Sequence, residues 1–146
     1  MRALSPKTKL ELPAASINEG FARVFAAAYA ARLDPTMEEL ADIKTVISEA
    51  VTNAIVHAYP EGGGTIYISA RVIGSDTLEF VIRDKGKGIG NIEQAMEPMF
   101  TTGGEERSGM GFTIMQSFTD RLTVWSREGK GTKVTMTKRI RKPAHR

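Results

Sequence analysis

The hydrophobic positions in the N-terminal half of the chain predict a strand followed by two helices. Residues 7–13 alternate between polar and apolar side chains and end at a proline, which is typical of an edge strand. Apolar side chains then recur every three or four positions, which predicts one helix over residues 16–33 and a longer one over residues 37–58. Asp34 and Pro35 separate the two helices, because proline cannot continue a helix.

Each of these helices carries a sequence signal for its first turn. A serine or threonine followed three residues later by glutamate can form a capping box, in which each side chain binds the backbone N–H of the other residue. Ser16 with Glu19 and Thr36 with Glu39 have this spacing. We therefore expect both helices to begin with a capping box.

From residue 65 on, the pattern changes to alternation and predicts two β-hairpins. Two shorter stretches with helical periodicity lie between the hairpins. The strands are expected at residues 65–73, 77–83, 122–126 and 132–137, and the helices at about residues 91–96 and 109–120. This mixed order of helices and antiparallel hairpins predicts an α+β two-layer sandwich with one sheet face uncovered.

Length and composition narrow the class of protein. The 146 residues suit a single domain over residues 1–146. The chain has no cysteine and two histidines, which excludes disulfides, cysteine nucleophiles and histidine-rich metal clusters. No apolar run is long enough to span a bilayer, and the N-terminus lacks the apolar stretch of a signal peptide. We therefore expect a cytoplasmic protein without membrane contact.

The excess of basic residues lies in the C-terminal tail. Residues 138–146 contain five of the 20 lysines and arginines and no acid, which leaves 15 basic against 17 acidic residues elsewhere. A short basic tail is typical of a solvated terminus. The charge therefore gives no reason to expect direct binding of nucleic acid.

The first chemical motif lies on the second predicted helix. Glu49, Asn53 and His57 are spaced four residues apart, so they form one polar line along the helix and can face a single ligand. A solvated helix face would show the same spacing. Asparagine is a poor helix former, however, and its amide oxygen is a suitable neutral ligand for Mg²⁺.

The second motif follows the third predicted strand and contains Asp84, Gly86 and Gly88. Glycines beside a carboxylate let the backbone approach a flat ligand closely. An aspartate there can accept a hydrogen bond from an exocyclic amino group such as that of adenine. The alternative is a plain turn between a strand and a helix.

The third motif, residues 107–111, opens the predicted helix near residue 109. Small residues at a helix N-terminus expose backbone N–H groups that suit phosphate oxygens, and Arg107 adds charged donors. The run over residues 100–104 could hinge a lid that closes over a nucleotide. A glycine-rich helix entry after a surface loop is the alternative.

Four segments resemble, in chain order, the N box, G1 box, lid and G2 box of the GHKL superfamily of ATPases and kinases, which includes gyrase B subunits and histidine kinases. They are the motif from Glu49 to His57, the motif from Asp84 to Gly88, residues 100–102 and residues 109–112. Longer stretches, residues 33–40, 43–55 and 106–115, resemble the sporulation anti-sigma factors, which are protein-serine kinases of that superfamily. The resemblance covers nearly the whole chain. It implies the Bergerat ATP-binding fold, with a mixed, mainly antiparallel sheet covered by helices on one face.

The resemblance also implies an activity. It implies a homodimer that binds ATP and Mg²⁺, binds and inhibits the sporulation sigma factor F, and phosphorylates a serine of an anti-anti-sigma factor. Two alternatives stay open. One is a stress-response switch kinase of the same superfamily that acts on a different sigma factor, and the other is a nucleotide-binding module without transfer activity. Glu49 argues against the module, because it matches the catalytic base of the family.

Roles follow residue by residue from the resemblance. Glu49 is implied as the general base, Asn53 as the magnesium ligand and Asp84 as the adenine acceptor. The residues implied to contact the nucleotide are Asn53, Asp84, Gly86, Gly88, Thr101, Thr102, Arg107, Ser108, Gly109, Met110, Gly111 and Thr132.

Other positions are less tied to the family pattern. Arg23, on the first predicted helix, matches an arginine implied to contact both protein partners, and a solvated helix arginine is the alternative. The superfamily varies at His57, so a structural histidine is equally consistent there. Lys85, Lys87 and the Gly103-Gly104 pair depart from the family pattern, and these departures bear on lid closure and affinity rather than on the choice of nucleotide.

Overall fold

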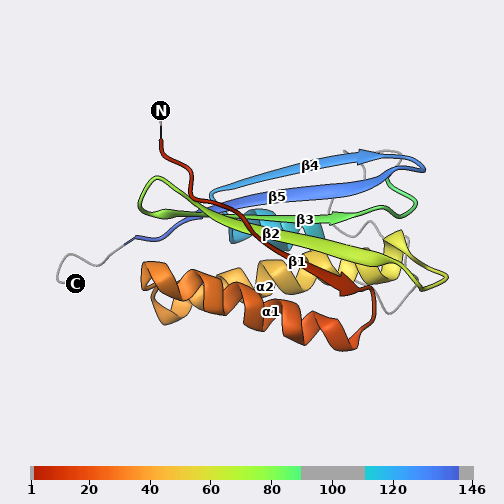
Figure 1. The fold of residues 1–146 in the computed structure, drawn as a ribbon, viewed down its shortest axis with the longest axis horizontal. Helices are drawn as coiled ribbons and strands as arrows, with labels where there is room; N and C mark the ends of the chain where they lie inside the picture. The colour runs from red at the N-terminus through yellow and green to blue at the C-terminus, as the bar shows by residue number, and fades with distance from the viewer. Residues whose placement is uncertain (1, 90–110, 142–146) are drawn as a thin grey trace.

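The computed structural model describes residues 2–89 and 111–141. This part of the chain forms two layers, a five-stranded sheet and a layer of helices on one of its faces (Figure 1). The α+β two-layer sandwich predicted from the sequence is therefore confirmed. The elements are β1 (Thr8–Pro13), α1 (Ile17–Ala30), α2 (Met37–Asn53), β2 (Thr65–Ile73), β3 (Thr77–Asp84), α4 (Gly111–Ser117), β4 (Arg121–Arg127) and β5 (Gly131–Arg139), with a 3₁₀ helix η1 (Ala31–Leu33) after α1 and a π-helix η2 (Ala54–Ala58) after α2.

The strands of the sheet run in the order β1-β2-β3-β5-β4, so β1 and β4 form its two edges. Every pairing among these five strands is antiparallel. Both predicted hairpins are confirmed, β2–β3 and β4–β5. The short helix predicted at residues 91–96 lies outside the described residues.

The two predicted capping boxes have different outcomes. At the start of α2, Glu39 donates its backbone N–H to Thr36 Oγ1 (3.1 Å), and Thr36 donates its own to Glu39 Oε1 (2.8 Å). The capping box predicted at Ser16 is wrong, because Ser16 already has helical backbone angles and its side chain caps nothing. The Glu19 carboxylate is held elsewhere, by Arg23 and by a serine of α2.

Both long helices change geometry in their last turn. The helix predicted through Leu33 tightens into η1 and stops at Asp34, which has a left-handed backbone (φ 52°). The helix predicted through Ala58 widens into the π-helix η2 after Asn53. π-turns inside helices occur often at functional sites.

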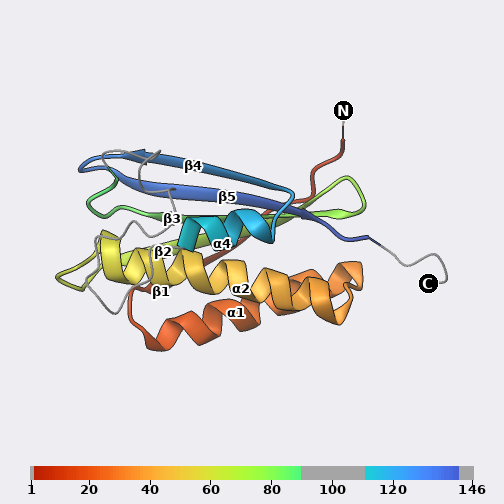
Figure 2. The same ribbon diagram turned by 180° about the vertical axis from the view of Figure 1, so that it is seen from behind.

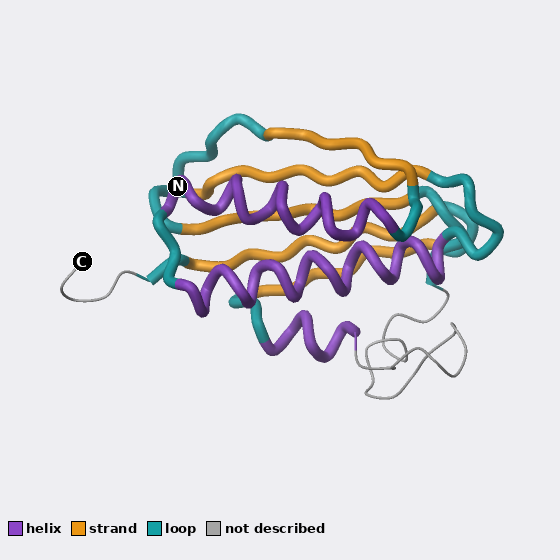
Figure 3. Tube along the Cα trace, turned by 90° about the horizontal axis from the view of Figure 1, so that it is seen from below, coloured by secondary structure: helices purple, strands orange, loops and turns teal. Residues whose placement is uncertain are grey.

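The core lies between the two layers. α2 lies between α1 and α4 (Figures 2 and 3). Apolar side chains of all three helices belong to the buried cluster that they share with the sheet. The largest fully buried side chains are Phe80, Ile43, Ile47, Ile66, Ile68, Leu78, Met115, Met136, Val46 and Val51. Burial of each such side chain stabilises the fold by about 1.5–3 kcal/mol. None of the helices in the described ranges is long and apolar enough to cross a membrane.

Candidate functional site

Three segments meet at one end of the molecule. They are the end of η2, the segment that follows β3, and the turn between β4 and β5 (Figure 1). Lys87 donates its backbone N–H to the carbonyl of Ala58 (3.1 Å), and its own carbonyl accepts from the N–H of Gly129 (2.7 Å). The segment after β3 is thus fixed between the helix layer and the last hairpin.

Asp84 is the polar centre of this end. It is the last residue of β3, and only 7% of its surface is exposed. Its Oδ1 atom accepts hydrogen bonds from the backbone N–H groups of Gly86 (3.0 Å) and Thr132 (3.2 Å). Two strands and the following loop therefore hold one carboxylate in a fixed orientation.

Burial changes the acidity of this carboxylate. Loss of hydration disfavours the charged form and raises the pKa of Asp84 above its ordinary value, while the bonds from Gly86 and Thr132 oppose the rise. A buried carboxylate with a perturbed pKa in a hydrogen-bonded frame is typical of a functional site. Its chemistry is that of a directed hydrogen-bond acceptor.

The two glycines of this motif are required by backbone packing. A Cβ atom on Gly86 would lie 2.2 Å from the carbonyl oxygen of Ala58. Gly88 has a φ of +76°, and a Cβ there would lie 2.1 Å from the carbonyl oxygen of Arg127. The sequence led us to expect close approach to a flat ligand, whereas these contacts are with the helix end and with the last hairpin. Both glycines therefore set the position of Asp84.

Thr132 belongs to a hydroxyl network that sequence reasoning found only in part. Its Oγ1 lies 2.7 Å from Ser126 Oγ, which also donates to the carbonyl of Gly131 (3.0 Å) and accepts from the N–H of Ile89 (2.7 Å). Ser126 was not predicted as a site residue. Its place directly opposite Thr132 in the β4–β5 register was the signal that could have found it.

Tyr59 is a second residue that sequence reasoning missed. Its hydroxyl donates to the carbonyl of Thr65 (2.8 Å) and accepts from the backbone N–H of Lys85 (2.7 Å). Tyr59 therefore ties the residue after Asp84 to the start of β2.

Glu49 and Asn53 lie on α2, and His57 follows in η2. All three are half-buried. The π-helix begins directly after Asn53, so His57 does not continue the line of Glu49 and Asn53 at the α-helical angle. Glu49 and Asn53 thus share one flank of the helix, and His57 is rotated away from it.

Contacts along α2 show which flank this is. Ser48 donates to Glu19 of α1 (2.9 Å), so that side of α2 faces α1. Asp42 precedes Glu49 by two helical turns and contacts Lys138 Nζ (3.4 Å), which also donates to the carbonyl of Phe118 just after α4. Glu49 and Asn53 therefore lie on the flank of α2 that is turned toward α4. α4 is the short helix beside α2 in Figure 3.

Asn53 fits a magnesium ion by the chemistry of its donor. Its amide oxygen is a hard, neutral ligand, and Mg²⁺ is commonly held by one or two side chains together with substrate phosphates. Among the residues that the structure describes, no three histidine, cysteine, aspartate or glutamate side chains gather into a site that could hold a metal ion. The residues present fit an ion shared between Asn53 and a bound nucleotide.

Of the residues predicted to form the lid and to bind phosphate, only one lies in the part of the chain that the structure describes. Gly111 is the first residue of α4. The candidate lid and phosphate-binding residues Thr101, Thr102, Arg107, Ser108, Gly109 and Met110 lie outside the described residues.

Arg23 lies on the exposed surface of α1. Its Nε donates to Glu19 Oε2 (2.6 Å), and Glu19 Oε1 accepts from Ser48 Oγ (2.9 Å). The side chain of Arg23 is 46% exposed. Arg23 is therefore oriented by Glu19 of α1, which is itself held by Ser48 of α2.

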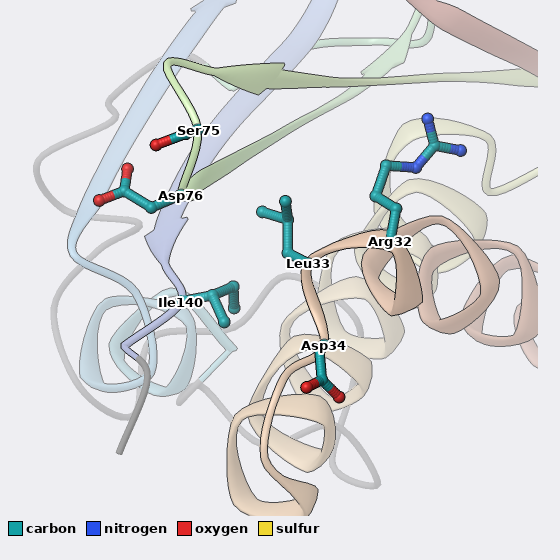
Figure 4. Close-up of a pocket in the computed structure, with 6 residues that line it drawn as sticks. All are labelled: Arg32, Leu33, Asp34, Ser75, Asp76 and Ile140. Atoms are coloured by element: carbon teal, nitrogen blue, oxygen red, sulfur yellow. The ribbon is translucent and has the colours of Figure 1, made fainter. Parts of the chain in front are cut away.

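A pocket of about 180 Å³ lies at the opposite end of the sheet (Figure 4). Asp76, one of the two acids that line it, is engaged within the fold, because Arg2 and Arg139 both form ion pairs with it. Hydrogen bonds from Thr77 and the two arginines lower the pKa of Asp76. The pocket is lined by Arg32, Leu33, Asp34, Ser75, Asp76 and Ile140, and it shares no residue with the site around Asp84.

Comparison with known proteins gives one family and many close relatives. The family model of the histidine kinase-like ATPase domain matches residues 12–138. The anti-sigma F factor of Thermoanaerobacter sp. (strain X514) is 58% identical over 86% of this chain and 87% of its own length. That of Anoxybacillus flavithermus is 53% identical over 91% of this chain and 92% of its own.

Solved structures share the fold at lower identity. A structure of the RsbU and RsbW domains of a Mycobacterium tuberculosis protein aligns with a TM-score of 0.70 and 21% identity. It covers 96% of this chain, which spans about a third (34%) of that longer protein. A mycobacterial sensor histidine kinase, MprB, aligns with a TM-score of 0.59 and 16% identity over 93% of this chain and 100% of its own. At these identities the likeness shows the fold alone.

Proposed function

Because the chain belongs to the histidine kinase-like ATPase family, we propose that it is an ATP-dependent anti-sigma factor. Within the family it belongs with the anti-sigma F factors, at 51–58% identity over most of its length. In this proposal it acts in the cytoplasm, where it binds and inhibits the sporulation sigma factor F and uses Mg-ATP to phosphorylate a serine of an anti-anti-sigma factor. The single observation that carries the nucleotide part is the buried, backbone-held carboxylate of Asp84.

Asp84 suits the recognition of adenine. The exocyclic amino group of adenine is a donor, and an acceptor fixed by Gly86 and Thr132 selects for a donor at that place. Guanine carries a carbonyl oxygen at the corresponding position, which would meet the carboxylate acceptor to acceptor. The Thr132–Ser126 hydroxyl pair lies beside this carboxylate and can adjust its donors to the ring.

The flank of α2 supplies the chemistry in this proposal. Glu49 accepts the proton of the substrate serine hydroxyl as its oxygen forms a bond to the γ-phosphorus, while the bond from that phosphorus to the β–γ bridging oxygen breaks and ADP leaves. Asn53 would hold a magnesium ion, which when bound would neutralise phosphate charge. The residues predicted to hold the phosphates are Arg107 to Gly111, which precede and begin α4 in the sequence.

Arg23 and a second copy of the chain complete the proposal. An exposed arginine that is oriented by Glu19 loses little conformational entropy when it pairs with a carboxylate of a partner. We assign Arg23 to a surface shared by the sigma factor and the anti-anti-sigma factor, so that the two compete. We further propose that the chain acts as a homodimer.

A displacement experiment tests this function. The tagged chain is loaded with sigma factor F, and its retention on a resin is measured after the anti-anti-sigma factor is added with Mg-ADP or Mg-ATP. The expected result is lasting displacement in ADP, where no phosphoryl group is available, and return of the sigma factor in ATP as the phosphorylated competitor leaves. Retention of a stress-response sigma factor in place of sigma factor F would support the alternative switch kinase.

A further inference from the structure

Ser126 lies beside the proposed adenine site, where its hydroxyl group contacts Ile89, Gly131 and Thr132. We propose that Ser126 is a positioning residue that fixes the hydroxyl group of Thr132 as a hydrogen-bond acceptor, so that the site rejects purines with a 6-oxo group. The inference rests on the nucleotide site proposed above and names a residue that sets its specificity.

The contacts of Ser126 Oγ determine where its proton lies. A serine hydroxyl group has one proton and two lone pairs. The backbone N–H of Ile89 can only donate, so it occupies one lone pair (2.7 Å). The carbonyl of Gly131 can only accept, so it takes the serine proton (3.0 Å). The contact with Thr132 Oγ1 (2.7 Å) therefore uses the second lone pair, and Thr132 is the donor.

The opposite direction of this last bond is unfavourable. Taken alone, the contact between the two hydroxyl groups allows either oxygen to donate. If Ser126 donated to Thr132, however, Ser126 Oγ and the carbonyl oxygen of Gly131 would lie 3.0 Å apart with no proton between them. Two acceptors at this distance repel each other, and a carbonyl of the buried residue Gly131 would lose a partner. Donation by Thr132 satisfies all three contacts of Ser126.

The order of the strands gives the direction of the Thr132 proton. Thr132 lies on β5, between β4 with Ser126 and β3 with Asp84. The proton therefore points toward β4, away from Asp84. The lone pairs of Thr132 Oγ1 remain for a ligand that lies beside the carboxylate. Asp84 and Thr132 thus present acceptors and no side-chain proton to this ligand.

Two neighbouring acceptors match an amino group, which adenine carries at position 6. Hypoxanthine and guanine carry an oxygen there, which needs a donor. A threonine hydroxyl group that rotated freely could turn its proton toward this oxygen and bind it. The bond to Ser126 prevents this rotation, because the serine oxygen would lose its donor. The hydrogen-bonding pattern of a site discriminates between such ligands, since the wrong ligand leaves site groups unpaired.

Affinities for ATP and ITP test the role of Ser126. ITP has an oxygen at position 6 in place of the amino group of ATP, and its N1 is protonated. Calorimetry with magnesium gives both dissociation constants for the full chain. We expect Ser126→Ala to lower the preference for ATP over ITP by about fivefold or more, which corresponds to one hydrogen bond, because Thr132 becomes free to donate. Ser126→Thr keeps the hydroxyl group and should keep the wild-type preference.

The preference separates this role from a structural one. Ser126 also holds Ile89 in the segment after β3, so its loss can loosen the frame of the site. A looser frame would weaken both nucleotides alike and leave their ratio unchanged. If Ser126→Ala does not fold, Ser126→Cys replaces it, since sulfur is a weak acceptor and the preference should fall in the same direction.

A double-mutant cycle tests the route through Thr132. Thr132→Val has nearly the shape of threonine and lacks the hydroxyl group. In this background, Ser126→Ala should leave the ratio of the ATP and ITP affinities unchanged, because no proton is left to turn toward the 6-oxo group.

The outcomes distinguish this inference from the proposed function. A wild type that binds neither nucleotide overturns the proposed function. A wild type that prefers ATP, with an unchanged preference in Ser126→Ala, overturns the role of Ser126 and leaves the nucleotide site standing. Equal binding of ATP and ITP by the wild type, or a loss of preference that persists in the Thr132→Val background, also overturns it. A loss that requires the Thr132 hydroxyl group and is absent in Ser126→Thr supports it.

Discussion

The carboxylate of Asp84 accepts the backbone N–H of Thr132 across two neighbouring strands, although the residues are 48 positions apart in the sequence. The bond means that the register between β3 and β5 fixes the orientation of the proposed adenine acceptor. The register between β4 and β5 places Ser126 beside Thr132. Sheet pairing therefore positions the carboxylate that we propose selects the nucleotide.

Asp84→Asn is expected to weaken ATP binding by about 10- to 100-fold. The asparagine oxygen can still accept the bonds from Gly86 and Thr132, so the loop keeps its frame. Its amide nitrogen, however, presents a donor to the adenine amino group. Calorimetry with ATP and GTP checks this, and the variant should also lose the preference of the wild type for ATP. Equal ATP affinity in the two proteins would show that Asp84 does not recognise adenine.

We also expect the wild type and Asp84→Asn to differ in how their stability depends on pH. Because burial raises the pKa of Asp84 in the folded state, the unfolded chain gives up this proton at a lower pH than the folded chain does. Asp84 therefore destabilises the fold increasingly as pH rises from its ordinary pKa through the raised value. Urea unfolding at several pH values should show wild type losing stability relative to Asp84→Asn over that window. A constant difference would contradict the burial of an ionised carboxylate.

Local patterns predicted the elements better than the contacts between them. Alternation and helical periodicity gave both hairpins and both long helices, and the Thr36 capping box needed only four adjacent residues. The Ser16 box failed because Glu19 binds Ser48 of α2, a contact between residues far apart in the sequence. No local pattern could show that competition.

In the candidate site, too, the sequence predicted some residues, whereas the roles of others depend on contacts formed on folding. Residue type and order pointed to Asp84, and the family resemblance pointed to Thr132. The roles of Gly86, Ser126 and Tyr59 depend instead on which backbones meet after folding. Gly86 is required by the carbonyl of Ala58, which lies 28 positions earlier in the chain. Packing of this kind also accompanies the π-turn of η2, for which periodicity gives no signal.

Asn53→Ala is expected to abolish phosphoryl transfer in the presence of magnesium, because it removes the proposed metal ligand. The position ends α2 and is half-buried, so alanine, a strong helix former, is tolerated by the helix. Transfer assays and ATP titrations with and without magnesium check this. Full transfer by the variant would exclude Asn53 as a ligand.

Arg23→Glu is expected to weaken the complexes with the sigma factor and with the anti-anti-sigma factor by about 30-fold or more, the loss of an interface anchor. Folding and ATP binding should be unchanged, since Arg23 is 46% exposed and its ion pair is with Glu19 on the same helix. Arg121→Glu makes the same charge change on β4 and serves as the control. Surface-plasmon measurements that gave wild-type affinity for both partners would reject the shared surface.

Glu49→Ala is expected to keep ATP binding and to lose about 10²- to 10⁴-fold in the rate of serine phosphorylation, because a positioned base contributes that much. The carboxylate is not needed to hold the nucleotide in the proposed mechanism. Single-turnover transfer and calorimetry on the same preparation separate the two effects. A parallel loss of binding and transfer would instead make Glu49 a residue that binds the nucleotide.

The most direct test of the proposed function is to identify the phosphorylated residue. The chain is incubated with its anti-anti-sigma factor and magnesium ATP labelled on the γ-phosphate, and the label is assayed for stability in acid. The account predicts acid-stable phosphoserine on the anti-anti-sigma factor with the wild type and almost none with Glu49→Ala. Acid-labile phosphohistidine, or no label on the partner while ATP is bound, would contradict it.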